Sequence, residues 1–475
     1  MTHYQLVVIG AGAGGLVVAI GASKAGKKVL LIEKGHYGGD CTNFGCIPSK
    51  TLIASAEKAH ALKEGKEYGI EFETPQFKAV KALERVRAMI AHVRSHEDPP
   101  ALDKLGVKTL TGLASFENPH ELNVEVTDGK FEKISADKIV IAAGSHAFIP
   151  PIEGIKDAPY LTNETIFDLK EIPKQLAVLG AGPIGCELAQ AFSRLGSEVI
   201  IIESLRGVMP NEDPDVDTVM AKRFQDEGIK LYTRCDANLI SYKDGKFLIC
   251  ITENGEHHDI EAEALLVSTG RRPNVADLKL DNARVEHSDK GIVVDAYGRT
   301  NQSHIFAVGD IVGAPFFTHL AENHGRAVLT SLILPGPLMK KIDKQALPRV
   351  TFTDPEVASV GLSEKQAKEM YGENKLAIYK VPFEDLDRAM TTGRTEGYVK
   401  VITKKWSSKI VGATIIAPRA GEMLPELSLA MLYNIPLRKL ARLIHPYPTF
   451  NAAIRKAADM WLTQTILPKL RGKKS

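Results

Sequence analysis

The stretch QLVVIGAGAGGLVVAIGASKAGKKVLLIE, residues 5–33, decides the fold of the first part of the chain. It predicts a buried strand at 5–9, a glycine-rich turn at 10–15, a helix at 16–26 and a second strand at 28–32. The turn has the spacing G-x-G-x-x-G, which suits a tight turn, a close approach of backbone to a pyrophosphate, and close packing of helix on strand. The residues expected to bind a dinucleotide here are Gly10, Gly12, Gly14, Gly15 and Glu33, whose carboxylate can bond ribose hydroxyls.

The same pattern recurs about 170 residues later, which favours two bound nucleotides over a chance repeat. A strand at 176–179 leads into a second G-x-G-x-x-G turn, then a helix through residue 195 and a strand at 198–202. The corresponding nucleotide-binding residues are Gly180, Gly182, Gly185 and Glu203.

Each unit is followed by a strand that runs into a small-residue turn, at 139–144 and at 265–270, as expected where an open sheet closes. A further short strand at 304–308 precedes Gly309 and Asp310. After Pro348 the pattern changes to alternating strands at 398–403 and 410–416, followed by an amphipathic helix at 422–433. This last region has no glycine-rich phosphate loop, so we predict an α/β protein with two Rossmann-like domains and a C-terminal α+β domain for assembly or substrate gating.

The composition of the chain argues against several classes of protein. Of 475 residues, 44% are hydrophobic and 25% are charged, as in an ordinary globular protein. The 60 Lys and Arg residues nearly balance the 58 Asp and Glu residues, and a net charge of +2 provides no basic field for nucleic acid. The apolar segment 6–22 is short for a bilayer span, is interrupted by glycines and lacks a basic region before it, which argues against export or insertion.

The five cysteines are too few for a disulfide scaffold, and an odd number leaves at least one thiol unpaired. This usage indicates a reducing compartment, and we expect a cytoplasmic protein. Three of the cysteines have no partner nearby in the sequence and are expected to be small buried hydrophobes: Cys186, Cys235 and Cys250.

The other two cysteines lie in GGDCTNFGCIPSK, residues 38–50. Residues five apart in a regular helix are separated by about 7.5 Å along its axis, whereas a disulfide needs Cα atoms within roughly 4.4–6.8 Å. The segment must therefore be distorted, with Gly45 and Pro48 providing the freedom and the break. Cys46 should lie near a helix N-terminus, where the dipole and Lys50 favour a thiolate, so we predict that it forms a redox pair with Cys41.

Two plainer interpretations of this segment are inert thiols and half of a zinc site that includes His36. The spacings do not match a zinc knuckle, and no second Cys/His pair follows. We therefore favour a redox disulfide and expect no metal ligands.

Residues 38–50 resemble the active-site signature of the class I pyridine nucleotide-disulfide oxidoreductases, which include glutathione reductase, dihydrolipoamide dehydrogenase and mercuric reductase. The resemblance extends through both nucleotide units, through AVGD at 307–310 and through VTFTDP at 350–355. It implies a homodimeric flavoenzyme with FAD in the first unit and a nicotinamide nucleotide in the second. The domains expected are FAD-binding at 1–148 and 271–345, NAD(P)-binding at 149–270 and dimerisation at 346–475.

The resemblance also implies roles for single residues. Cys46 contacts the flavin and Cys41 exchanges with substrate, so electrons pass from nicotinamide through FAD to the disulfide and then to an acceptor. Lys50 lies beside the flavin and pairs with Glu187, and Asp310 bonds the ribityl or phosphate part of FAD. The residues expected to complete the cofactor sites are Gly112, Ser145, Gly270, Phe316, Phe317, Thr318 and His319.

The run HPYPTFNA, residues 445–452, departs from the family pattern. Disulfide-reducing members carry His-Pro-Thr with a Glu five residues after the His, an acid/base pair that serves the cysteines of the other subunit. Tyr447 and Ala452 occupy these positions, and a tyrosine with an ordinary pKa near about 10 is a poor proton shuttle at neutral pH. His445 is a candidate substitute, and a histidine that bonds local backbone is an equally good interpretation.

The departure argues against glutathione or lipoamide as substrate. Tyr447 resembles mercuric reductase, yet the C-terminal cysteine pair of that enzyme and its N-terminal metal-capture domain are missing, so we expect a mercuric-reductase-like branch with an unidentified small-molecule or protein disulfide acceptor. The alternatives are an NADH oxidase, a quinone or metal reductase, and a dihydrolipoamide-dehydrogenase-like subunit of a larger complex. Glu203 favours NADH because it accepts from a ribose 2′-OH and repels a 2′-phosphate, although Arg206 nearby would tolerate NADPH.

The C-terminal segment 461–474 mixes apolar residues with Lys469, Arg471, Lys473 and Lys474. Such a tail can touch a membrane surface or a partner protein. From the sequence we favour a solvated tail or a helix that packs in the dimer.

Overall fold

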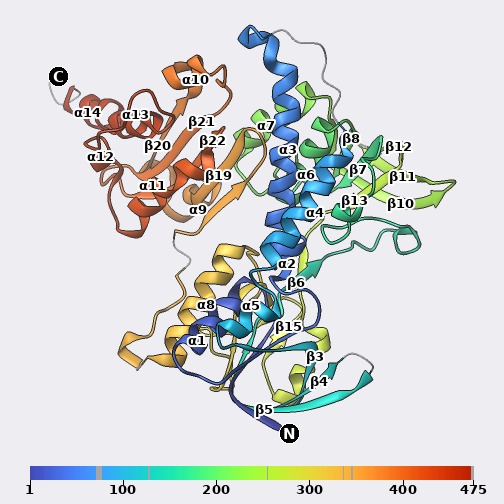
Figure 1. The fold of residues 1–475 in the computed structure, drawn as a ribbon. Coiled ribbons are helices and arrows are strands. Elements are labelled where there is room, and N and C mark those ends of the chain that lie inside the picture. The colour runs from blue at the N-terminus through green and yellow to red at the C-terminus, as the bar shows by residue number, and fades with distance from the viewer. Residues whose placement is uncertain (71–77, 127–128, 254, 335, 344–345, 472–475) are drawn as a thin grey trace. The chain divides into compact units, whose positions relative to one another are not determined.

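The structure of the protein, a computed structural model, describes residues 1–475 except 71–77, 127–128, 254, 335, 344–345 and 472–475 (Figure 1). The chain forms two compact units. The first comprises Met1–Pro151, Pro159–Pro173 and Leu265–Ile342, and the second comprises Ile152–Ala158, Lys174–Ala264 and Asp343–Ser475. Each unit is therefore assembled from segments that are distant in the sequence.

The first unit is built on a six-stranded mixed sheet. Its strands are β1 (Thr2–Ile9), β2 (Val29–Glu33), β3 (Lys108–Asn118), β4 (Glu121–Val126), β5 (Phe131–Ile141) and β17 (Ile305–Ala307). β1 pairs in parallel with β2 and β5, β2 with β3, and β5 with β17. β4 pairs antiparallel with both β3 and β5. The parallel part of the sheet is the arrangement that the first βαβ pattern predicts.

Two apolar layers flank this sheet. The helices of the unit are α1 (Ala13–Lys24), α2 (Gly39–Asn43), α3 (Cys46–Glu64), α4 (Val80–Arg94), α5 (Pro99–Lys104) and α8 (Thr318–Ile333). On one face, Leu6 and Val8 of β1 join the core with α1 and α8. On the other face, Val7 and Ile9 pack with the segment 275–294. The alternation follows from the two-residue period of a strand that is buried on both sides.

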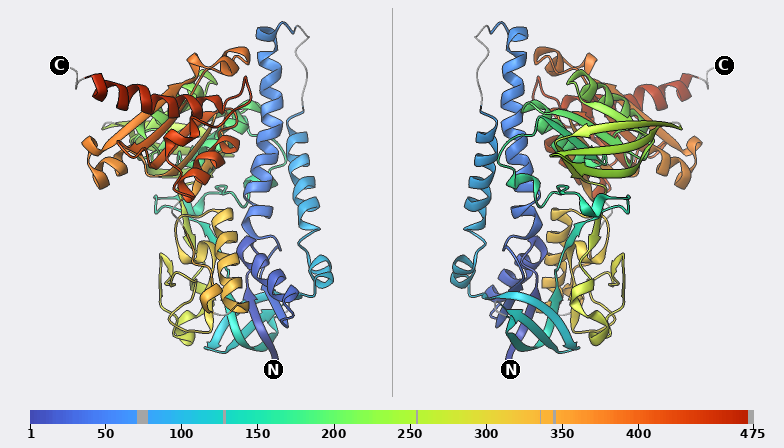
Figure 2. Two further views of the ribbon diagram at one scale, coloured as in Figure 1. Left: turned by 90° about the vertical axis from the view of Figure 1, so that its left-hand side faces the viewer. Right: turned by 90° about the vertical axis from the view of Figure 1, so that its right-hand side faces the viewer.

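Short pairings complete the first unit. β6 (Ser145–Ala147) pairs antiparallel with β14 (Arg271–Pro273), and β15 (His287–Ser288) pairs antiparallel with β16 (Gly291–Ile292). The helices α3 and α4 lie side by side in both views of Figure 2. Nη1 of Arg85 on α4 donates to the carbonyl oxygen of Thr51 on α3 at 2.8 Å, which links the two helices.

The second unit contains the second nucleotide pattern. Its elements are β7 (Gln175–Leu179), α6 (Pro183–Arg194), β8 (Glu198–Glu203), α7 (Pro214–Asp226), β9 (Lys230–Thr233), β10 (Cys235–Lys243), β11 (Lys246–Glu253) and β12 (Glu256–Ala262), followed by β13 (Ala264–Val267) at the boundary between the units. β7, β8 and β9 are parallel neighbours, whereas β10, β11 and β12 form an antiparallel sheet. The strand–turn–helix–strand order is again the predicted one.

The C-terminal part of the second unit is a five-stranded antiparallel sheet in the order β18-β19-β22-β21-β20. The strands are β18 (Pro348–Thr351), β19 (Glu356–Gly361), β20 (Leu376–Pro382), β21 (Tyr398–Lys404) and β22 (Ile410–Ala417). The helices are α9 (Glu364–Tyr371), α10 (Asp387–Thr391), α11 (Ala420–Leu432), α12 (Leu437–Leu440), α13 (Ala452–Met460), the π-helix η11 (Trp461–Ile466) and α14 (Leu467–Arg471). α11 and α13 cover one face of the sheet and α9 packs on the other.

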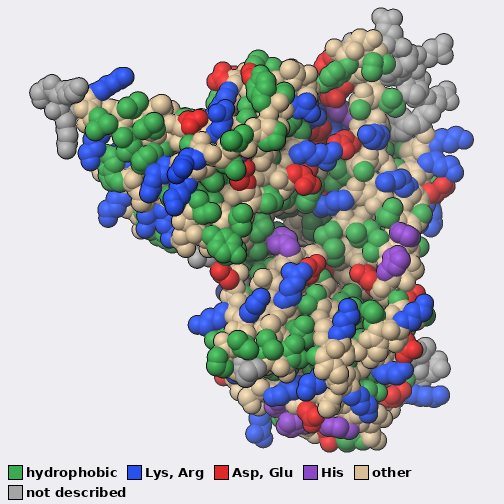
Figure 3. Space-filling view, turned by 60° about the vertical axis from the view of Figure 1, so that its left-hand side comes forward, with side chains coloured by type: hydrophobic (Ala, Val, Ile, Leu, Met, Phe, Trp, Pro, Cys, Tyr) green, Lys and Arg blue, Asp and Glu red, His purple; other side chains and the backbone are tan. Residues whose placement is uncertain are grey.

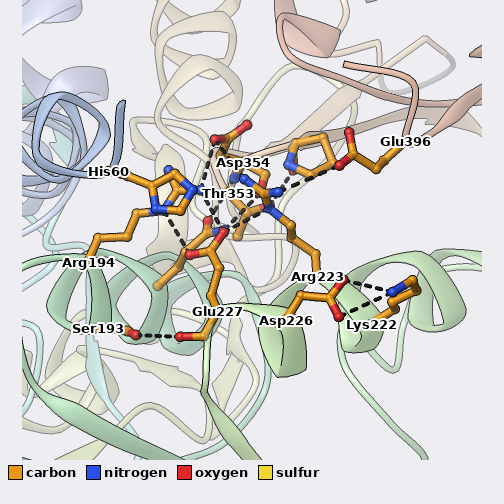
Figure 4. A network of polar contacts seen from close by, with 12 residues as sticks. His60, Ser193, Arg194, Lys222, Arg223, Asp226, Glu227, Thr353, Asp354 and Glu396 are labelled. Carbon is orange, nitrogen blue, oxygen red and sulfur yellow. Dashed lines mark hydrogen bonds and ion pairs between the residues drawn. The ribbon is translucent and has the colours of Figure 1, made fainter. Parts of the chain in front are cut away.

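A buried charge network joins the two parts of the second unit (Figure 4). Nη2 of Arg194 on α6 lies 2.7 Å from Oε1 of Glu227 and 2.8 Å from Oδ2 of Asp354, which follows β18. Arg223 on α7 also pairs with Glu227, at 2.8 Å. The side chains of Arg194 and Glu227 are 4% and 5% exposed. Because water hardly reaches them, their opposite charges must stabilise each other.

The predicted fold class is confirmed: two Rossmann-like strand–turn–helix patterns and a C-terminal α+β sheet are all present. The predicted domain boundaries stay predictions. Of the predicted tail, residues 461–471 form η11 and α14, whereas Lys473 and Lys474 lie outside the described residues. Among the helices that the structure describes, none combines the length and the apolar character needed to span a bilayer.

Candidate functional site

The first glycine-rich turn connects β1 to α1. Gly10 has φ of +104°, and a Cβ on it would lie 2.3 Å from the carbonyl oxygen of Ala142. A Cβ on Gly15 would lie 2.0 Å from the carbonyl oxygen of Gly10. Both positions therefore require glycine for packing alone. At Gly12, by contrast, the nearest atom to a Cβ would be 3.8 Å away, on Gly39, so the turn leaves space in front of α1.

The carboxylate of Glu33 fixes this turn. Oε2 accepts a hydrogen bond from the N–H of Ala11 at 2.7 Å, and Oε1 accepts one from the N–H of Gly35 at 2.8 Å. Each oxygen keeps further acceptor capacity for a ribose hydroxyl. The space before Gly12, the N-terminus of α1 and this carboxylate together fit the pyrophosphate and ribose of a dinucleotide.

The second glycine-rich turn has the same backbone conformation and the same carboxylate hydrogen bonds as the first. Gly180 has φ of +103°, and a Cβ on Gly182 would meet no atom within 4 Å. Oε2 of Glu203 accepts from the N–H of Ala181 at 2.7 Å, and Oε1 accepts from the N–H of Leu205 at 2.8 Å. The geometry fits a second dinucleotide for the same reasons as the first.

The predicted redox segment is divided between two helices. Cys41 lies in α2, and Cys46 is the first residue of α3. Gly45 lies between them, where a Cβ would be 3.1 Å from the carbonyl oxygen of Asp40 and 3.3 Å from Cα of Cys41. The break before Gly45 gives the distortion that the spacing requires. Pro48 contributes no break, because it lies in the first turn of α3, where helical N–H groups have no intrahelical acceptor.

The thiols of Cys41 and Cys46 are half-buried and hydrogen-bonded to each other. This bond, together with burial and the charge that Cys46 can carry, raises the pKa of Cys41 above its ordinary value. Sγ of Cys46 also lies 3.4 Å from Oγ1 of Thr318, the first residue of α8. The sequence placed Thr318 in the FAD site; the structure places its hydroxyl against the thiol pair, so the first residues of two helices meet there.

A polar network extends from this segment to Asp310. Nη2 of Arg271 lies 3.1 Å from Oδ1 of Asp40, the residue before Cys41. Nε of Arg271 donates to Oγ of Ser145 at 2.8 Å, and Ser145 in turn donates to Oδ2 of Asp310 at 2.6 Å. Nδ2 of Asn163 donates to the same Asp40 oxygen at 3.0 Å. The predicted residues Ser145 and Asp310 are thereby connected to the redox segment.

Three members of this network were missed from the sequence: Asp40, Asn163 and Arg271. Arg271 directly follows Gly270 at the end of a predicted strand, and functional groups gather where parallel strands end, so a signal for it existed. For Asn163 we find no comparable signal. Burial raises the pKa of Asp310, and the hydroxyl of Ser145 and the charge of Arg271 offset only part of that rise.

Other predicted cofactor residues have contacts of their own. The rings of Phe317 and His319 stack with centroids 5.2 Å apart. Gly112 is in β3, where a Cβ would lie 2.7 Å from the carbonyl oxygen of Glu125, so strand pairing alone accounts for a glycine there. The proposed contacts of Gly112, Phe316, Phe317 and His319 with FAD stay predictions.

The predicted pair Lys50–Glu187 involves both units. Lys50 is half-buried on α3, one turn after Cys46. Glu187 is buried on α6, where Oε1 accepts a hydrogen bond from the N–H of Phe352 at 2.9 Å. The ion pair between Lys50 and Glu187 stays a prediction.

His445 makes the local backbone contact that one of the two interpretations expects, and its acid/base role stays a prediction. Its Nδ1 lies 3.2 Å from the carbonyl oxygen of Leu443, which is a local backbone contact. Its Nε2 lies 3.1 Å from Oε1 of Glu426 on α11, and Nδ2 of Asn451 donates to Oε2 of the same carboxylate at 3.1 Å. The side chain of His445 is 5% exposed, so its ring is held in a fixed His–Glu pair.

Tyr447 has a different environment. Its side chain is 78% exposed, and its hydroxyl donates to Oδ2 of Asp387 at 2.9 Å. The bond to Asp387 raises the pKa of Tyr447 above its ordinary value. Tyr447 is thus less able to give up its proton than an ordinary tyrosine.

The remaining cysteines belong to the second unit. Cys186 is fully buried, and burial raises its pKa; its thiol donates to the carbonyl oxygen of Ala181 at 3.1 Å. Cys235 is also buried, whereas Cys250 is only half-buried. Within the described part of the chain, no three His, Cys, Asp or Glu side chains gather as a metal ion would need.

Comparison with known proteins agrees with this arrangement. The model of the family described as "Pyridine nucleotide-disulphide oxidoreductase" matches residues 4–325, and the model of that family's dimerisation domain matches residues 347–458. The mercuric reductase of Lysinibacillus sphaericus is 32% identical over 465 residues, covering 97% of this chain and 84% of the relative. The dihydrolipoyl dehydrogenase of Mycobacterium bovis is 34% identical over 459 residues, covering 96% of this chain and 97% of the relative.

A solved structure is similar over the whole length. It is the Cu(II) complex of the HOCl-induced flavoprotein disulfide reductase RclA from Escherichia coli, with a TM-score of 0.87 and 28% sequence identity, covering 97% of this chain and all of that one. Two dinucleotide-binding folds and a thiol pair define a flavoprotein disulfide reductase fold. The chain belongs to the pyridine nucleotide-disulfide oxidoreductases, a FAD-dependent family that uses pyridine nucleotides, and its dimerisation domain supports a homodimer.

Proposed function

We propose that the protein transfers two electrons from NADH, through FAD and the Cys41–Cys46 disulfide, to an oxidised acceptor. The observation that carries this proposal is the hydrogen-bonded contact between the two thiols at the start of α3. When bound, FAD would supply the redox chemistry that links the nicotinamide to the disulfide. In the overall reaction, NADH, a proton and the oxidised acceptor give NAD⁺ and the acceptor reduced by two electrons.

The two thiols have different tasks in this proposal. Cys46, at the N-terminus of α3 and beside the hydroxyl of Thr318, is placed to carry the thiolate that forms when the disulfide is reduced. Cys41, whose pKa is raised, keeps its proton in the reduced pair. Because the thiolate is the nucleophile in exchange, Cys41 can attack an acceptor only if a base removes that proton.

We assign the acid/base role to His445, with Glu426 as the residue that positions its ring. The pair has the residue types that the family resemblance leads one to expect, although Glu426 comes from α11 rather than from the segment after His445. Tyr447, at the aligned position, is a poorer proton donor because its bond to Asp387 raises its pKa.

For the nicotinamide nucleotide we propose a preference for NADH. Glu203 ends β8, at the strand end that faces the ribose in such folds, where a carboxylate disfavours a 2′-phosphate. Nη2 of Arg206, the cation that would tolerate NADPH, donates to the carbonyl oxygen of Glu212 at 2.8 Å. Steady-state kinetics with both nucleotides test this preference, and a higher kcat/KM for NADPH would contradict it.

The acceptor is to be found by measuring NADH consumption against a panel. The names of the relatives place lipoamide, Hg(II) and Cu(II) on it, and the alternatives add glutathione disulfide, quinones and oxygen. Cys41→Ser and Cys46→Ser should abolish turnover of the physiological acceptor, whereas Cys250→Ser, which removes a similarly half-buried thiol of the second unit, should not. Full turnover in Cys46→Ser would favour an oxidase or quinone reductase that bypasses the thiols.

A further inference from the structure

We propose that the second unit binds anionic lipid bilayers through one basic and apolar surface. This surface, called here the tail surface, consists of residues 404–409, 435–442 and 461–471. Its last segment lies beyond the dimerisation-domain match, which ends at residue 458. The inference does not depend on the proposed reaction.

The three segments are distant in the sequence but contact one another. Nε1 of Trp461 donates to the carbonyl oxygen of Lys405 at 3.1 Å. The guanidinium carbon of Arg438 lies 5.6 Å from the centre of the Trp461 ring. Nζ of Lys469 lies 4.0 Å from the centre of the Trp406 ring, so α14 is held on the loop between β21 and β22. The tail is therefore a packed part of this unit, which brings three sequence segments into one surface.

The charge of the tail surface is of one sign. None of its three segments contains Asp or Glu, in a chain whose acidic and basic residues nearly balance overall. Its cationic residues are Lys404, Lys405, Lys409, Arg438, Lys439, Arg442, Lys469 and Arg471. Basic residues close to a membrane are attracted to anionic lipid. The charge is thus complementary to an anionic lipid surface.

Large apolar side chains are exposed between these cations. Trp406 is 51% exposed, Leu462 is 49% exposed and Leu470 is 57% exposed. Figure 3 shows hydrophobic and basic side chains interleaved next to the C-terminal residues. Apolar groups that enter the headgroup region, surrounded by Lys and Arg that remain at its surface, are the pattern of an interfacial membrane anchor.

Two other occupants fit less well. Nucleic acid matches the charge but would leave Leu462 and Leu470 against a polar backbone. A second copy of the same surface would bring like charges together, which opposes association. A bilayer satisfies both the cations and the apolar side chains, and it would bring the enzyme close to acceptors that dissolve in lipid, such as quinones.

Flotation of the full-length holoenzyme with vesicles tests the proposal. The protein should float with vesicles of equal parts phosphatidylcholine and phosphatidylglycerol, should not float with pure phosphatidylcholine, and should be released at about 0.5 M NaCl. The variant Lys469→Glu/Leu470→Gln/Arg471→Glu should bind at least about tenfold more weakly. The control is the triple variant Lys130→Glu/Phe131→Gln/Lys133→Glu, which makes the same change of charge and also removes an exposed apolar side chain. Its site lies outside the tail surface, and Glu132 lies between its two cations.

A second variant, Leu462→Gln/Leu470→Gln, keeps every charge and should also bind more weakly, since both apolar residues enter the interface. Unchanged NADH consumption in both tail variants shows that they are folded. The proposal is overturned if the tail variants and the Phe131 control lose binding equally, or if neutral vesicles bind as well as anionic ones. It is also overturned if duplex DNA at the same salt concentration displaces the vesicles.

Discussion

Nε2 of His445 lies 3.1 Å from Oε1 of Glu426, although 19 positions separate the two residues. If this pair handles the proton of Cys41, His445→Gln should lower kcat with the physiological acceptor by roughly 10²–10⁴-fold, the usual contribution of general acid–base catalysis. The rate of flavin reduction by NADH in stopped flow should not change, because it precedes acceptor chemistry. Glu426→Gln should cause a smaller loss that Glu426→Asp partly restores. Tyr447→Phe is the matched control, and a comparable loss in that variant would transfer the role to Tyr447.

The raised pKa of Cys41 gives a second prediction. Its largest cause is the hydrogen bond with Cys46, so Cys46→Ala should return the pKa of Cys41 toward the ordinary value, about 8.5. In the reduced enzyme, alkylation of Cys41 by iodoacetamide follows its thiolate fraction. The pH profile of this alkylation, resolved from other thiols by mass spectrometry, should therefore move to lower pH in Cys46→Ala. An unchanged profile would show that burial, rather than Cys46, controls Cys41.

Asp310 gives a stability prediction with a definite sign. Because burial raises its pKa in the folded protein, the folded state binds the proton more readily than the unfolded state does. At pH values above the ordinary pKa of an aspartate, about 3.9, the buried carboxylate therefore lowers the free energy of unfolding. This destabilisation disappears as the pH falls below that value. Apoprotein with Asp310→Asn should melt at a higher temperature than the wild-type apoprotein at pH 7. The difference should vanish near pH 4, and a lower melting temperature at pH 7 would contradict the account.

The network at Arg194 should matter for stability. Arg194→Met removes one cation from Glu227 and Asp354 and leaves them Arg223 and Arg394, at an expected cost of at most about 3–5 kcal/mol in the free energy of unfolding. Burial alone would raise the pKa of Asp354, but Arg394 and Arg194 lower it below its ordinary value. The advantage of the wild type should hold above about pH 4 and be lost as the pH falls through the depressed pKa. Chemical unfolding at several pH values measures this. Arg326→Met, which removes an exposed ion pair, should cost less than about 1 kcal/mol.

The two nucleotide-binding folds could be predicted from the sequence because the residues that determine them are close together in the chain. Gly10 needs positive φ, Gly15 packs against Gly10, and the strand period determines which side chains enter the core. The break between Cys41 and Cys46 followed in the same way, from helix geometry and the requirements of a disulfide.

Contacts between distant segments were not accessible in this way. Arg271 meets Asp40 across almost half of the chain, and Glu426 on α11 contacts His445 in the loop between α12 and α13. No periodicity or local spacing encodes either pair. The sequence prediction for the tail used only the residues of the tail itself. The structure adds that Lys405 and Arg438 lie against Trp461, so that basic residues from three segments form one surface.

The central claim is that electrons pass through the Cys41–Cys46 pair, and anaerobic titration with NADH tests it most directly. Wild-type enzyme should take up about two equivalents of NADH per FAD, one for the flavin and one for the disulfide. Cys46→Ser should take up about one equivalent, whereas Cys250→Ser should behave as the wild type. Uptake of a single equivalent by the wild type, or of two by Cys46→Ser, would contradict the claim.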